Sequence, residues 1–183
     1  MPVKMGTSLV VSSGNSCGKS GRVLVLGLGN VLLKDEGVGV HVAGQLQKHV
    51  LPCNVEVIDG GTAGLDVLLS QQGLDKLVVI DAMRAGKKPG TIYKTRLKTG
   101  EKDKLTQIFS EAEQPKISLH QVGLIDALAA AEKLNCAPKE IVIIGVEPKE
   151  MDCGLELTEP VKQRLAEIVN MVLEEIKDAV HGR

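Results

Sequence analysis

Five short segments rich in valine, isoleucine and leucine recur along the chain, and helical patterns lie between most of them. Near-continuous apolar runs of this kind are typical of parallel strands that are buried on both faces of a sheet. The pattern therefore predicts an α/β protein in which helices cover both faces of a mainly parallel sheet. The expected strands are RVLVLGLG, VEVID, KLVVIDA, TIYKTRL and EIVIIGVEP.

Helical periodicity and capping residues place the expected helices between and after these strands. The final helix has Thr158 as its expected cap and Pro160 in its first turn. The expected helices span residues 37–49, 63–72, 101–109, 119–135 and 159–179.

Length and composition point to an ordinary globular protein. The 183 residues suffice for one domain, which we expect over residues 22–183. We expect residues 1–21 to form a flexible N-terminal extension. A net charge of −1 and only two aromatic residues argue against nucleic acid as a partner. No apolar run approaches the roughly 20 residues that span a bilayer. The four cysteines are widely spaced and form no CxxC, so we expect reduced thiols and a cytoplasmic setting.

The segment SSGNSCGKS is similar to a phosphate-binding P-loop, because it ends in Gly18, Lys19 and Ser20. A P-loop needs a glycine five positions before Gly18, where this chain has Ser13. It must also open a helix, whereas an apolar strand follows here. The sequence therefore argues against a P-loop.

The segment GLGNVL is an incomplete dinucleotide-binding fingerprint. Gly27 and Gly29 match it, but Leu32 replaces the third glycine. Asp35 and Glu36 would also bring negative charge close to a pyrophosphate, and like charges repel. A dinucleotide-binding oxidoreductase stays an alternative, and it predicts tight binding of a nicotinamide or flavin cofactor.

Three acids follow or end the first three expected strands. Glu36 follows the first strand, Asp59 ends the second and Asp81 ends the third. Because parallel strands all point the same way, these carboxylates should gather at the carboxyl edge, where open α/β sheets place their ligands.

His120 begins an expected helix whose capping box is formed by Ser118 and Gln121. The positive end of a helix disfavours an imidazolium, so the ring should stay neutral and able to bind a metal. Two carboxylates and one imidazole suit a divalent transition metal with open coordination positions.

Each of these residues also has a purely structural interpretation. Asp35 could be only a helix N-cap, with Glu36 favoured by the helix dipole. Asp59 and Asp81 could only terminate strands and form turns, and His120 could be a capped histidine without a ligand. The expected convergence on one edge favours a functional site.

Five sequence blocks, in the same order, make the chain similar to the hydrogenase maturation proteases, which are endopeptidases. The resemblance implies a twisted, mainly parallel five-stranded sheet with helices on both faces, hence a three-layer α/β fold. The blocks are VLVLGLGNVLLKDEGVGVHVA, VIDGGTAGLDVLL, LVVIDAMRAGKKPGTIY, SLHQVGLIDALAAA and IVIIGVEPKEMDCGLELTEPV.

The resemblance also implies roles for individual residues. Glu36 corresponds to the family's first metal-binding acid, Asp81 to the second and His120 to the histidine ligand. Asp59 falls on a family acid near the cleft. Glu36, Asp81 and Asp59 are therefore the expected catalytic acids, and Glu36, Asp81 and His120 the expected metal ligands.

By the same resemblance, the chain would cut a C-terminal peptide from the nickel-loaded large-subunit precursor of a nickel-iron hydrogenase. Nickel would come with the substrate, and a monomer is expected. The metal could polarise the scissile carbonyl or a water, or it could only dock the substrate while a carboxylate activates water. A non-catalytic metal-binding chaperone is an alternative that shares the acids but releases no peptide.

Overall fold

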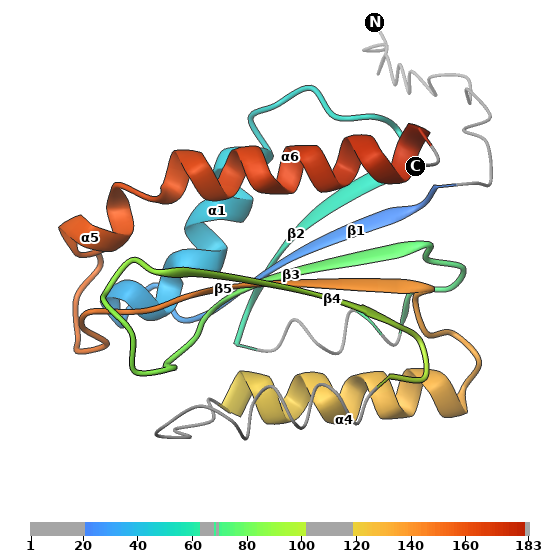
Figure 1. The fold of residues 1–183 in the computed structure, drawn as a ribbon, viewed down its shortest axis with the longest axis horizontal. Coiled ribbons are helices and arrows are strands. Elements are labelled where there is room, and N and C mark those ends of the chain that lie inside the picture. Colours follow the sequence, from blue (N-terminus) through green and yellow to red (C-terminus); the bar gives the residue numbers. More distant parts are fainter. Residues whose placement is uncertain (1–20, 63–67, 69, 102–118, 182–183) are drawn as a thin grey trace, which may run out of the picture.

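The structure is a computed structural model, and it is described here over four stretches of the chain (Figure 1). Several sequence predictions fall outside those stretches: residues 1–20 of the N-terminal extension expected over residues 1–21, most of the helices expected at 63–72 and 101–109, and the Ser118 cap. The described residues are 21–62, 68, 70–101 and 119–181.

Five strands form one sheet in the order β2–β1–β3–β5–β4. The first four strands in this order pair in parallel, and only the edge strand β4 runs antiparallel, to β5. The predicted mainly parallel five-stranded sheet is therefore confirmed. The strands are β1 (Val23–Leu28), β2 (Val55–Gly61), β3 (Lys76–Ala82), β4 (Ile92–Lys98) and β5 (Glu140–Val146).

Helices cover both faces of the sheet (Figure 1). One face carries α1 (Val38–Leu46), which follows the 3-10 turn η1 (Lys34–Gly37), together with α6 (Leu165–His181). The other face carries α4 (Leu119–Lys133).

The helix expected over residues 159–179 is divided in two. A short α5 (Glu159–Lys162) precedes α6. The break comes where the N–H of Arg164 donates to the carbonyl of Val161 at 3.0 Å, an i to i−3 bond that tightens the turn. The prediction of one continuous helix is therefore wrong at this point.

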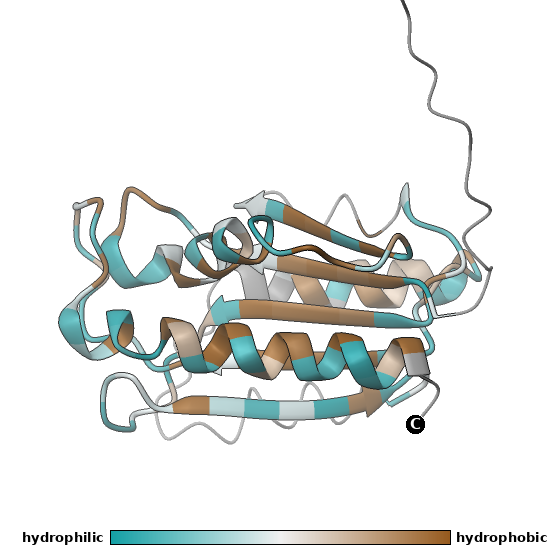
Figure 2. Cartoon of the chain, turned by 90° about the horizontal axis from the view of Figure 1, so that it is seen from above, coloured by the Kyte–Doolittle hydropathy of each residue, from teal (hydrophilic) through white to brown (hydrophobic). Residues whose placement is uncertain are grey.

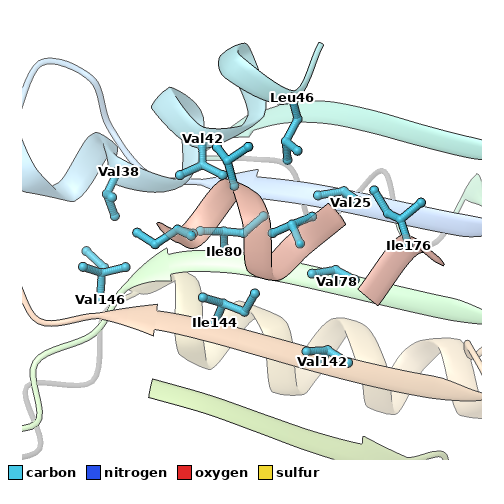
Figure 3. Close-up of a cluster of buried hydrophobic side chains, with 14 of the residues drawn as sticks. Val25, Val38, Val42, Leu46, Val78, Ile80, Val142, Ile144, Val146 and Ile176 are labelled. Atoms are coloured by element: carbon cyan, nitrogen blue, oxygen red, sulfur yellow. The ribbon is translucent and has the colours of Figure 1, made fainter. Parts of the chain in front are cut away.

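The alternation of strand side chains divides the core into two clusters. On β3, Val78 and Ile80 pack towards α1 and α6 (Figure 3), whereas Leu77 and Val79 pack towards α4. In Figure 2 the inner strands are brown over most of their length, as expected for strands covered on both faces.

A buried ion network fixes α6 to the amino end of the sheet. Glu175 is 1% exposed, and it pairs with Lys76 at 2.9 Å, Lys94 at 2.7 Å and Arg96 at 2.8 Å. Burial alone would raise the pKa of Glu175, but hydrogen bonds from Lys94 and Lys76 outweigh it and hold that pKa below its ordinary value.

Two further expectations concern the cysteines and the membrane. Cys136 and Cys153 are free thiols, but Cys53 is disulfide-bonded, so the expectation of reduced thiols is wrong for Cys53. Over the described stretches, no helix is both long enough and apolar enough to cross a membrane.

The glycines around α1 allow its backbone to lie directly on the sheet. A Cβ placed on Gly39 would come within 2.2 Å of the Ile80 carbonyl oxygen and 2.3 Å of the Leu28 carbonyl oxygen. A Cβ on Gly27 would come within 2.2 Å of the Gly39 oxygen. These contacts are with backbone atoms, which cannot swing aside. The glycines of this segment therefore serve close packing of helix on sheet.

Two glycine substitutions within α1 test this close packing. Gly39→Ala should lower the free energy of unfolding by about 3 kcal/mol, because its methyl group overlaps the sheet backbone. Gly44→Ala is the matched control, since nothing lies within 4 Å of its added Cβ. It should be neutral or stabilising by about 0.5–1 kcal/mol. Urea unfolding of both variants measures the difference, and equal stabilities would contradict the packing argument.

Candidate active site

The carboxyl ends of β1, β2, β3 and β5 meet at one edge of the sheet. In the strand register, Gly27 pairs with Asp59 on one side and with Ile80 on the other. Asp81 lies one residue further along β3, where it pairs with Gly145 of β5. Asp59 and Asp81 therefore lie at similar positions along the strand direction, at the edge where open α/β sheets bind ligands.

The two aspartates nevertheless belong to opposite faces of the sheet. Residues two apart on a strand share one face. Asp81 is therefore on the same face as Val79, which packs towards α4. Asp59 is on the same face as Val57, which packs towards α1 and α6. Strand β1 lies between β2 and β3, so their backbones are roughly 10 Å apart. The structure does not bring Asp59 and Asp81 side by side.

Their surroundings also differ. Asp81 is 6% exposed, and its Oδ1 accepts a hydrogen bond from the N–H of Ala82 at 2.8 Å. Asp59 is exposed, and its Oδ1 accepts the N–H of Gly61 at 3.0 Å, the bond of an Asx turn. The structural interpretation of Asp59 as a turn former thus has a bond to support it.

His120 lies in the first turn of α4. The far end of α4, at Lys133, leads through a short connection into the start of β5, so the helix begins at the carboxyl edge of the sheet (Figure 1). Since α4 covers the face to which Asp81 belongs, the backbones of His120 and Asp81 share one edge and one face. The side chain of His120 is outside the described part of the structure.

Glu36 lies in η1, and this turn contacts β3, the strand that ends in Asp81. The side chain of Glu36 is partly buried. Its Oε2 atom is fully buried and has no hydrogen-bond partner within the described residues. Buried carboxylate oxygens are normally paired, because an unpaired one loses its hydration without compensation. A cation or a donor brought by a ligand would satisfy this atom.

Glu36 and Asp81 are the predicted metal ligands whose side chains the structure describes. Among the described residues, no group of three His, Cys, Asp or Glu side chains is placed to hold a metal ion. The imidazole of His120 is outside the described part of the structure, so the set of Glu36, Asp81 and His120 stays a prediction. Two carboxylates alone would make an incomplete site for a transition metal.

Asp35 has a different role from the N-cap that the local sequence indicates. The residue before η1 is Leu33, and no side chain caps the turn. Asp35 is instead fully buried, and its carboxylate accepts hydrogen bonds from residues more than a hundred positions away. The donors are the N–H groups of Lys149, Glu150 and Thr158 and the hydroxyl of Thr158.

Glu147 is a further acid at this edge, and the sequence patterns above did not indicate it. It is 5% exposed, and it accepts bonds from the N–H groups of Ala85 and Gly86 and from the Tyr93 hydroxyl. Burial, followed by the bond to Glu147, raises the pKa of Tyr93 well above its ordinary value. The position of Glu147 directly after β5 could have indicated it, because the rule that ligands bind at the carboxyl ends of parallel strands also selected Asp81.

Comparison with known proteins identifies the family. The family model described as hydrogenase maturation protease matches residues 40–175. A hydrogenase 2 maturation protease of Escherichia coli is 35% identical over 160 residues, which are 86% of this chain and 92% of that protein. The chain belongs to the hydrogenase maturation protease family. The hydrogenase expression/formation protein HupD of Thiocapsa roseopersicina is 40% identical over 155 residues, covering 84% of this chain but only 66% of that protein.

Solved structures of hydrogenase maturation proteases share the fold. The hydrogenase-maturating endopeptidase HybD of E. coli superposes with a TM-score of 0.75 at 34% identity, over 86% of this chain and 93% of that one. Family membership decides between the alternatives: the chain is an endopeptidase, and not an oxidoreductase or a non-catalytic chaperone. The family-model match includes Asp81 and His120 but begins after Glu36.

Proposed function

We propose that this endopeptidase removes a C-terminal peptide from the nickel-loaded large-subunit precursor of a nickel-iron hydrogenase. The observation that carries the proposal is the buried Oε2 of Glu36, which has no partner within the described residues and lies in the turn that contacts β3. A carboxylate in this state gains most from a cation, and the substrate would deliver that cation as its nickel.

The roles of the remaining residues follow from their places. Asp81 is buried and oriented by its bond to the Ala82 N–H, so it would present a fixed carboxylate on the face covered by α4. His120, in the first turn of α4, would add an imidazole from the same edge. These three groups would complete a coordination shell whose other ligands belong to the precursor.

Hydrolysis also needs a base that takes a proton from the attacking water. Glu36 and Asp81 are two carboxylates at the edge that could do this, either beside a nickel that polarises the scissile carbonyl or beside one that only docks the substrate. Asp59 would support catalysis from the opposite face of the sheet, without ligating the metal. We further expect the reaction to take place in the cytoplasm and the enzyme to act as a monomer.

Nickel should act as a checkpoint for cleavage. Because the predicted ligands form an incomplete site, the purified protease should carry little nickel, yet it should cut a nickel-loaded precursor and leave a nickel-free precursor intact. Elemental analysis of the protease, together with mass spectrometry of both precursor forms after incubation, measures this. Stoichiometric nickel in the isolated protease, or equal cleavage of both forms, would contradict the checkpoint.

Isosteric substitutions should separate metal recognition from the remaining chemistry. Glu36→Gln and Asp81→Asn should weaken binding of the nickel-loaded precursor by about tenfold or more, because each removes a carboxylate ligand. Asp59→Asn should leave that affinity within about threefold, whatever its effect on the cleavage rate, because Asp59 lies two strands away from Asp81 on the other face.

Affinities measured by biolayer interferometry on immobilised precursor, and cleavage measured by mass spectrometry, give the two quantities for each variant. Asp59→Asn is a matched comparison for Asp81→Asn, since both side chains accept a local backbone N–H that an asparagine oxygen can still accept. Wild-type affinity in Glu36→Gln and Asp81→Asn would end the assignment of these acids as ligands.

A further inference from the structure

We infer that Asp35 is a positioning residue: its buried carboxylate holds the turn that carries Glu36 at the carboxyl edge, an inference that rests on the proposed role of Glu36. Asp35 is 0% exposed. Its Oδ2 accepts the N–H groups of Lys149 at 2.9 Å and Glu150 at 3.1 Å and the hydroxyl of Thr158 at 2.7 Å. Its Oδ1 accepts the N–H of Thr158 at 2.7 Å.

These bonds join two segments that we call the seam: residues 32–36, between β1 and α1, and residues 149–158, between β5 and α5. Backbone bonds strengthen the seam. The N–H of Gly154 donates to the Leu32 carbonyl at 2.9 Å, and the N–H of Lys34 donates to the Gly154 carbonyl at 2.9 Å. The side chains of Lys34 and Glu150 add an ion pair at 2.6 Å.

The turn needs this support, because its own backbone conformation is unfavourable. Lys34 has a φ of 45°, in the left-handed region that favours glycine. A residue other than glycine stays in that region only where its surroundings hold it there. The bonds to residues 149–158 supply that constraint, and the carboxylate of Asp35 accepts four of them.

The position of the Glu36 carboxylate depends on the seam. Its Oε2 makes no hydrogen bond to a described residue, so no partner is seen to orient that atom. The position of Glu36 therefore follows from its backbone. Its N–H donates to the carbonyl of Leu33 at 3.1 Å within the same turn. Its carbonyl oxygen packs closely against Gly29, where an added Cβ would come within 1.8 Å of it. Asp35, the preceding residue, therefore sets where the Glu36 carboxylate can reach.

Thr158 offers the mildest test. It precedes α5 as its N-cap, but its side chain makes no capping bond there and donates to Asp35 instead. Thr158→Val removes this donor at constant shape and should lower kcat/KM for the nickel-loaded precursor about tenfold, since a hydrogen bond to a buried charge is lost. Thr158→Ser keeps the donor and should restore kcat/KM to within about twofold of the wild type.

Thr99→Val is the matched control. Its hydroxyl donates to the carbonyl of Pro138 beyond the end of β4, at the opposite edge of the sheet. This variant should keep kcat/KM within about twofold of the wild type, because it removes a comparable hydroxyl bond far from the seam. Circular dichroism at the assay temperature shows the folded fraction, so that rates are compared per folded molecule. Equal activity of folded Thr158→Val and Thr99→Val would overturn the inference.

A double-mutant cycle separates positioning from general stability. In the otherwise wild-type chain, Asp35→Asn should weaken binding of the nickel-loaded precursor about tenfold, because an amide cannot accept all four bonds. In a Glu36→Gln background, the same change should weaken binding no further, since Asp35 acts through Glu36. Equal losses in both backgrounds would show a merely structural role and would overturn the inference.

The cycle also distinguishes this inference from the proposed function. If Glu36→Gln impairs binding while folded Asp35→Asn and Thr158→Val bind and cleave normally, the positioning role alone is wrong. If Glu36→Gln itself binds and cleaves as the wild type does, the proposed site is wrong, and the inference about Asp35 fails with it.

Discussion

Parallel pairing of β1, β2, β3 and β5 is the constraint on which the site depends. A parallel neighbour can be reached only by a crossover, so every one of these strands ends at the same edge and a connecting segment begins there. Residues as far apart in sequence as Glu36, Asp81 and His120 are thereby brought to one edge of the molecule. The antiparallel strand β4 runs in the opposite direction, so it begins at that edge and does not end there.

Much of this could be predicted from strand-end chemistry. The apolar runs located all five strands, and the rule that ligands bind at carboxyl ends selected Asp59 and Asp81. The sequence could not separate these two aspartates, because the face to which each side chain belongs depends on strand order and register. Asp59 lies on the outer strand β2 and on the side of α1 and α6, whereas Asp81 lies on the side of α4.

The role of Asp35 could not be predicted, for a related reason. An acid just before a helix has a local explanation as an N-cap, and only the folded chain shows that its donors are Lys149, Glu150 and Thr158. The two acids of this turn, Asp35 and Glu36, differ in their hydrogen bonding. Asp35 is fully bonded within the protein, whereas Glu36 keeps one buried oxygen without a partner among the described residues. In the proposed mechanism, Asp35 holds the backbone of the turn so that Glu36 can meet a ligand.

The most direct test is whether binding of the protease changes the coordination of nickel in a hydrogenase large-subunit precursor. X-ray absorption at the nickel edge can be measured on a cleavage-resistant, nickel-loaded precursor, alone and bound to the protease. We expect the wild-type protease to add oxygen and nitrogen neighbours to the nickel, and Glu36→Gln, at concentrations that still saturate binding, to add one oxygen fewer. A nickel spectrum that stays unchanged when the wild-type protease binds would contradict ligation of the metal by Glu36, Asp81 and His120.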